Sequence, residues 1–457
     1  MATETSQPNI TKQELPNATA VSQKTIVRPD AGGQVIWTSV WFHIAVFVVA
    51  FLLVVSRRPD ALFNPQFFAE DGALFYTAAY QHGLQSLLIS YGGYLHTVLR
   101  LAALLAQLFP FAWGPLVMNL IGIAFQVLPV NVFLSSRFSN IGFSMRLVGS
   151  FIYLALPNSY EIDANLTNVQ WHLAPLACLL LIARPATSKA WLVFDATILV
   201  LTSLSSPMGF LLVPLAAFVW WKRRDGASAF SLAFLIPGTI IQGLTFALNW
   251  RARQFSHLNT TSQAIVNGGA NGATLGRFFA IVGRQVFFSA LLGLKTQHRI
   301  MRLHSIHWIE LVATLVGFAV LLYALRYAAT ELKVFILFAV GVLTLALMNP
   351  LAGPPERAQW DWLCIPACGN RYYIYPMMAF LASLLWIANR RTSRVPRYFA
   401  MFLLLLFLPI GIWRDWRYPR FVDFRFQQYA AQFEHAPSGT EVVIPINPDW
   451  SMKLTKR

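Results

Sequence analysis

The sequence predicts an all-α polytopic membrane protein with about eleven membrane-spanning helices. Of its 457 residues, 56% are hydrophobic and only 12% are charged, whereas soluble domains average about 45–50% and 25%. The hydrophobic residues form successive runs that approach the length needed to cross a bilayer. This composition excludes an ordinary soluble enzyme, and it also excludes a disordered chain, which would need low hydrophobicity and a high density of charge.

The first apolar run covers about residues 35–55 and follows a polar segment, 1–33, which we expect to be a disordered cytoplasmic tail. No signal peptide is expected, because this run begins late and no small-residue cleavage site follows it. The further expected spans are 113–135, 147–159, 171–184, 190–204, 209–221, 229–249, 308–325, 333–349, 375–389 and 398–413.

Two apolar stretches, 94–109 and 276–294, could either span the bilayer or lie in its interface. If both are interfacial and the N-terminus is cytoplasmic, 16 of the 35 basic residues lie in the tail and the short inner segments. This arrangement obeys the positive-inside rule. It predicts a transmembrane domain over 34–413, which includes long outer loops at 57–112 and 250–307. A small extracytoplasmic segment follows at 414–457, where T-E-V-V-I-P-I-N-P alternates like a short strand.

The net charge of +16 does not require nucleic acid as a partner, because membrane orientation accounts for much of it. The other 19 basic residues lie in long outer segments. Long segments are translocated largely regardless of their charge, so this excess is not a topology signal. We expect an anionic ligand on the outer face to account for it.

The first outer loop contains adjacent acids, Glu70 and Asp71, in the aromatic segment F-F-A-E-D-G-A-L-F-Y. Apolar residues then recur at helical spacing until Gly83, which is placed to end the helix. Acids at a helix N-terminus are often simple caps. A carboxylate among aromatic rings can instead have a pKa suited to general-base catalysis.

The second outer loop, 157–173, gathers Glu161, Asp163 and His172 between two apolar runs. Polar residues so placed often mark a substrate site, although a solvated interfacial loop has the same pattern. Paired acids could also hold a divalent cation through oxygen ligands, but no motif identifies a metal or another cofactor.

A third outer segment, 354–376, ends with Arg371 and Tyr372 where the chain returns to the membrane. An arginine at that depth needs an anionic partner, and a lipid phosphate would provide one. An ordinary interfacial arginine in an aromatic belt is the alternative. Cys364 and Cys368 lie in the same segment and could form a disulfide in an oxidising compartment.

These features resemble the GT-C superfamily of integral-membrane glycosyltransferases, in an uncharacterised bacterial subfamily. The similarity lies in the cytoplasmic N-terminus, the acid–aromatic–glycine pattern of Asp71, Phe75 and Gly83, and the late R-Y element of Arg371 and Tyr372. The stretch 94–109 matches the interfacial helices of the family. The resemblance implies a GT-C-like fold, a polyprenyl-phosphate-linked sugar as donor, and a glycan, lipid or protein acceptor on the outer face of the bacterial inner membrane.

The resemblance implies that Asp71 is the catalytic base, that Glu70 assists it, and that Arg371 binds the donor phosphate. Tyr372, Glu161, Asp163 and His172 are the further expected binding residues. Two other functions remain open from the sequence. A transporter or flippase of a lipid-linked sugar or another anion would carry charge near the bilayer midplane. A non-catalytic envelope assembly protein would leave the acids at 70–71 replaceable.

Overall fold

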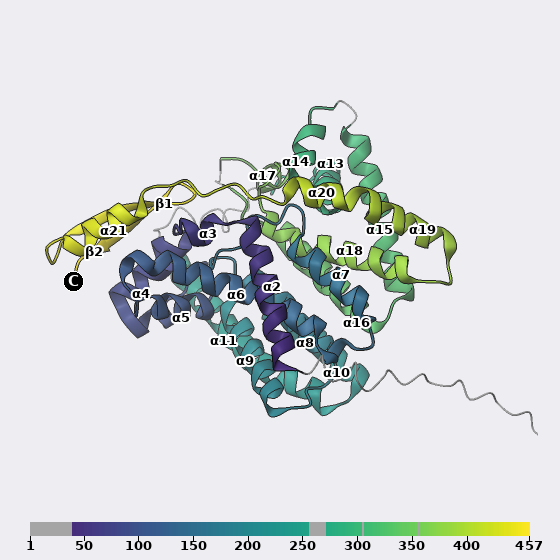
Figure 1. The fold of residues 1–457 in the computed structure, drawn as a ribbon, viewed down its shortest axis with the longest axis horizontal. Coiled ribbons are helices and arrows are strands. Elements are labelled where there is room, and N and C mark those ends of the chain that lie inside the picture. Colours follow the sequence, from purple (N-terminus) through teal and green to yellow (C-terminus); the bar gives the residue numbers. More distant parts are fainter. Residues whose placement is uncertain (1–38, 256–270, 304–305, 354–355) are drawn as a thin grey trace, which may run out of the picture.

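The computed structural model describes residues 39–255, 271–303, 306–353 and 356–457. The described chain is mostly helical and ends in one two-stranded sheet (Figure 1). This confirms the helical class expected from the sequence. The expected disordered tail, 1–33, lies outside the described residues.

Seven helices among the described residues are long and apolar enough to cross a membrane. Six of them match expected spans, and the seventh, residues 275–300, contains the stretch expected to be interfacial. The seven are α2 (Val40–Arg57), η3–α6 (Phe111–Trp113, Gly114–Leu134), α11 (Gly226–Phe255), α13–η5–α14 (Leu275–Phe279, Ala280–Phe288, Ser289–Ile300), α15 (Ile306–Tyr327), α16 (Thr330–Met348) and α19–η7–α20 (Arg394–Phe402, Leu403–Phe407, Leu408–Asp415).

The other five expected spans are shorter helices of 12 to 17 residues. They are α7 (Phe143–Leu154), α8 (Gln170–Ile182), α9 (Lys189–Ser205), α10 (Gly209–Arg223) and α18 (Ile374–Asn389). At 1.5 Å per residue they extend about 18–26 Å, which is less than the roughly 30 Å of the hydrocarbon core. The total of about eleven spans therefore remains a prediction.

The first outer loop folds into short helices, as the sequence predicts. They are α3 (Asp60–Phe63), η1 (Asp71–Tyr76), α4 (Thr77–His82), η2 (Gly83–Leu88) and α5 (Thr97–Ala106). Gly83 ends α4 with a φ of +55°, a conformation that favours glycine. α5 is only 10 residues long, which is too short to cross a bilayer and fits the interfacial position expected for 94–109.

The loop between α7 and α8, residues 155–169, enters the helix bundle rather than lying on its surface. All of its residues are buried except Tyr160, Glu161 and Thr167. Irregular backbone at membrane depth is tolerated where protein buries it and bonds its polar groups. This inward path explains why both flanking helices are short.

The C-terminal segment packs on the segment expected to be the first outer loop (Figure 1). It contains α21 (Phe426–His435) and the antiparallel strands β1 (Glu441–Ile446) and β2 (Trp450–Thr455). α21 contacts η3, and β2 contacts η1 and α4. The strand expected from T-E-V-V-I-P-I-N-P is confirmed as β1. We call residues 426–457 the C-terminal arm.

The close approach of the buried loop to α6 makes Gly122 sensitive to substitution. A Cβ at this position would lie 2.6 Å from the carbonyl oxygen of Asn165. We expect Gly122→Ala to lower the free energy of unfolding by about 1–3 kcal/mol, as measured by thermal unfolding in detergent. Gly142→Ala is the matched control, because its Cβ would meet no atom within 4 Å. Equal stability of the two variants would contradict the close approach.

Candidate functional site

The fold joins the three outer segments that the sequence singles out. The backbone N–H of Leu166, in the buried loop, donates to Asp71 Oδ2 at 3.3 Å. The guanidinium of Arg371, in η6 (Asn370–Tyr372), forms an ion pair with Glu161 of the same loop. The buried loop therefore links the E-D-G segment on one side to the R-Y element on the other.

Asp71 opens the wide, π-type helical segment η1 and is 1% exposed. Its Oδ1 has no hydrogen-bond partner among the described residues. Burial raises the pKa of the Asp71 carboxyl well above its ordinary value, and the charge of Glu70 raises it further against the hydrogen bonds from Thr167 and Leu166. A carboxyl with a raised pKa and one free oxygen is suited to accept a proton.

Glu70 lies beside Asp71 but is less buried, and it points to different partners. The Tyr91 hydroxyl donates to its Oε1 at 3.4 Å, and the Thr167 hydroxyl donates to its Oε2 at 3.4 Å. The two adjacent acids therefore have distinct environments: Asp71 is buried and Glu70 is partly exposed. Such a difference allows the two carboxyls to take separate roles.

Arg371 is held by several polar contacts, and part of its side chain stays accessible. Its backbone N–H donates to Glu161 Oε2 at 3.1 Å, and its Nη2 donates to the carbonyl of Leu351 at 2.6 Å. The guanidinium also lies 4.8 Å from the centre of the Tyr372 ring. The side chain remains 29% exposed.

The structure adds an aromatic group that sequence reasoning missed, formed by Tyr91, Tyr94 and His96. Tyr94 stacks on His96 with ring centres 4.1 Å apart. Burial raises the pKa of Tyr91 to about 12, helped by the charge of Glu70 and opposed by that of Arg371. The signal in the sequence is Y-G-G-Y-L-H, in which two glycines with positive φ reverse the chain and bring the two tyrosines together.

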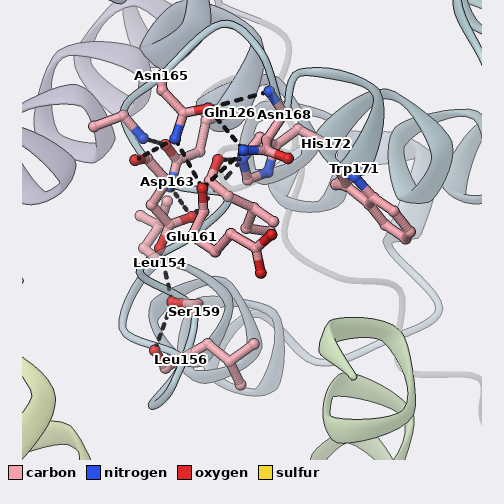
Figure 2. A network of polar contacts seen from close by, with 12 residues as sticks. Gln126, Leu154, Leu156, Ser159, Glu161, Asp163, Asn165, Asn168, Trp171 and His172 are labelled. Carbon is pink, nitrogen blue, oxygen red and sulfur yellow. Dashed lines mark hydrogen bonds and ion pairs between the residues drawn. The ribbon is translucent and has the colours of Figure 1, made fainter. Parts of the chain in front are cut away.

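Asp163 and His172 lie within an internal polar network instead (Figure 2). Gln126 and Ser159 each donate to the Asp163 carboxylate at 2.7 Å, and the Tyr418 hydroxyl donates to it as well. Both ring nitrogens of His172 have protein partners, the hydroxyl of Tyr153 and the carbonyl of Ile162. These contacts favour a structural role, and the binding role expected from the sequence remains a prediction.

Several of the cations expected on the outer face have partners within the protein, so the excess assigned to a ligand is smaller than the sequence suggests. Arg277 pairs with Asp361 at 2.5 Å and Arg284 with Glu310 at 2.7 Å. Arg57 donates to the carbonyls of Leu154 and Leu156, and Arg58 to that of Asp163. Each of these four arginines thus has an anion or a carbonyl of the protein as a partner, although the Nε atoms of Arg58 and Arg284 have none among the described residues.

Neither a metal site nor a disulfide appears in the described part of the chain. No group of three or more His, Cys, Asp or Glu residues there could hold a metal ion. Cys178, Cys364 and Cys368 are all free thiols. The site is therefore described by its acids, its arginine and its aromatic rings.

No protein-family model matches this chain, and no curated protein matches it. Among solved structures it is similar to an oligosaccharyltransferase of Archaeoglobus fulgidus tethered to an acceptor peptide, with 14% identity and a TM-score of 0.41. It is also similar to the same organism's AglB in complex with an inhibitory peptide and a dolichol-phosphate, with 14% identity and a TM-score of 0.42, and to an apo form, with 12% and 0.42.

These matches cover 87–88% of this chain but only 58–59% of the archaeal chains. The chain thus spans about three-fifths of the length of those proteins. Identity and TM-score this low transfer no residue roles or chemistry from them to this chain.

A substitution at Asp163 separates the structural role from the binding role. Asp163→Ala leaves the buried Arg57, 3.7 Å away, without its acidic partner. Breaking a buried pair costs about 3–5 kcal/mol, so we expect a large fall in unfolding temperature in detergent. Asp361→Ala, at a partly exposed pair, is the control and should cost about 0–1 kcal/mol. Wild-type stability of Asp163→Ala with loss of function would instead support the binding role.

Proposed function

We propose that this protein is a membrane glycosyltransferase that moves a sugar from a polyprenyl-phosphate carrier to an acceptor hydroxyl at the outer membrane face. The observation that carries the proposal is the buried Asp71 carboxyl, which has a raised pKa and a free Oδ1, in one site with Arg371. The acceptor class, whether glycan, lipid or protein, and the bacterial inner membrane as location belong to the same proposal.

In the proposed reaction, the acceptor O–H loses its proton to Asp71 Oδ1. The acceptor oxygen attacks the anomeric carbon, and the bond from that carbon to the phosphate oxygen breaks. The electron pair stays on the polyprenyl phosphate. One displacement inverts the anomeric centre and needs a single base with a good leaving group, unlike the paired carboxylates of glycoside hydrolysis. Glu70, the partly exposed acid beside Asp71, orients the acceptor.

Arg371 stabilises the phosphate as negative charge develops on it. Its guanidinium fork suits phosphate, and its partial exposure leaves it accessible. Glu161 keeps the guanidinium in place through the ion pair and through the backbone N–H of Arg371. Tyr372 supports the guanidinium with its ring. The donor phosphate would share Arg371 with Glu161 rather than meet an unpaired cation.

A transporter would place its working charges near the bilayer midplane. In the proposed topology the candidate groups lie on the outer side: Glu70 and Asp71 lie at the start of η1, and Arg371 precedes α18. This position favours an enzyme that meets both a lipid-linked donor and an acceptor from the aqueous side.

Replacing the proposed base should abolish transfer while leaving the protein folded. We expect Asp71→Asn to reduce transfer by about 10²–10⁴-fold, the usual contribution of a positioned base. The measurement is mass spectrometry of envelope glycans from cells that express wild-type protein, the variant or no protein. Glu356→Gln, at an exposed outer acid, is the control. Glycans that do not differ between cells with and without the protein would refute the proposed function.

The pH dependence of transfer should follow the protonation of Asp71, because a base must be deprotonated to act. Activity then rises as pH rises through the pKa of Asp71. Glu70→Gln removes a charge that raises this pKa, so the midpoint should move to lower pH. Thr167→Val removes a hydroxyl that lowers it, so the midpoint should move to higher pH. Shifts in the same direction would exclude Asp71 as the titrating group.

A further inference from the structure

The I-P-I-N-P segment of the C-terminal arm pairs with the residues that lead into the candidate base. Asn447, which directly follows β1 and is 3% exposed, forms a parallel bridge with Phe68. Its carbonyl accepts the N–H of Ala69 at 2.5 Å, and its N–H donates to the carbonyl of Phe67 at 3.2 Å. The arm therefore bonds the backbone just ahead of Glu70 and Asp71.

The turn held by this pairing has an unfavourable backbone conformation. Ala69 has a φ of +45°, in the left-handed region that residues with a Cβ rarely adopt. Such a conformation persists where the surrounding structure holds it, and it is common at functional sites. The hydrogen bonds that Asn447 makes to Phe67 and Ala69, on either side of Phe68, hold Ala69 in this conformation.

Asn447 is itself held by the segment that leads into the arm. Its side-chain oxygen accepts the N–H of Val422 at 2.8 Å, and its side-chain nitrogen donates to the Val422 carbonyl at 2.9 Å. The neighbouring Ile446 packs so closely on η1 that a Cβ on Gly72 would lie 3.1 Å from its Cδ1. The end of β1 thus contacts Ala69 and Gly72, the residues directly before and after the two acids.

We propose that Asn447 is a positioning residue for Asp71, and that the C-terminal arm acts as a clamp that keeps this carboxyl enclosed in its productive orientation. The inference rests on the proposed function in treating Asp71 as the base. Releasing the clamp lets the 67–72 segment relax and admits water to Asp71. Because burial is the main cause of the raised pKa of Asp71, that pKa should then fall.

The test follows Asp71 without requiring turnover. A hydrophobic carbodiimide reacts with protonated carboxyl groups, and its adduct on Asp71 can be measured by mass spectrometry across a pH series in full-length protein in detergent. Asn447→Ala keeps the backbone bonds to Phe67 and Ala69 but removes the two side-chain bonds to Val422 that hold the strand end in place, so the midpoint of labelling should fall by at least about one pH unit, the direction expected when a buried acid is hydrated. Lys453→Ala, on the exposed face of β2, should keep the wild-type midpoint.

A disulfide across the bridge provides the rescue. The variant combines Phe68→Cys and Asn447→Cys in a background with the three native cysteines replaced by alanine. Bridge partners are within reach of a disulfide, so the midpoint should be low when the pair is reduced and return when it is oxidised. A wild-type midpoint in both Asn447→Ala and the reduced pair would overturn the inference.

The labelling result is independent of the proposed reaction. If the midpoint shifts as expected while Asp71→Asn leaves envelope glycans unchanged, the clamp stands and the proposed function fails. If Asp71→Asn abolishes transfer while the midpoint does not respond to the arm, the function stands and the positioning role of Asn447 fails.

Discussion

The structure depends on one buried electrostatic contact, between Asp163 and the groups that surround it. The buried loop carries irregular backbone into the helix bundle, where unpaired N–H and C=O groups are costly. Asp163 receives hydrogen bonds from Gln126 of α6, from Ser159 of the loop and from Tyr418 of the C-terminal segment. Arg57 at the end of α2 completes the charge balance. Four distant parts of the sequence thus meet at one carboxylate.

This contact determines where the candidate site lies. The loop is anchored at Asp163, and two of its three partly exposed residues, Glu161 and Thr167, lie on either side of this anchor in the sequence. Glu161 then meets Arg371, and Thr167 meets Glu70. The internal network and the proposed site therefore share one loop. The network around Asp163 holds this loop in place, and the proposed site supplies the groups that can contact a substrate.

Much of the fold follows from local sequence pattern. Long apolar runs predict the helices, Gly83 marks the end of α4, and alternation predicts β1. The sequence also singles out Glu70, Asp71, Glu161 and Arg371 as candidates, because acids or arginine among apolar and aromatic residues stand out. Their assembly could not be predicted from one sequence, since it depends on backbone contacts such as that of Leu166 with Asp71.

The missed features have the same physical origin. The sequence of a polar loop is the same whether water or protein surrounds its side chains. The sequence alone therefore does not distinguish a structural role of Asp163 and His172 from a binding role. From the sequence, an arginine such as Arg57 is expected to be unpaired, because the carbonyls that it bonds are known only from the structure. The pairing of Asn447 with Phe68 joins segments about 380 residues apart and follows no local rule.

Phosphorus NMR of a polyprenyl phosphate titrated with the purified full-length protein tests the proposed binding of a lipid-linked phosphate by Arg371. We expect saturable binding that weakens by roughly 10-fold or more in Arg371→Gln, since a hydrogen bond to a charged group contributes about 1.5–3 kcal/mol. Arg357→Gln, at an exposed arginine in the same outer segment, should bind as wild type does. Binding that is absent from the wild type, or equal in wild type and Arg371→Gln, would contradict the account.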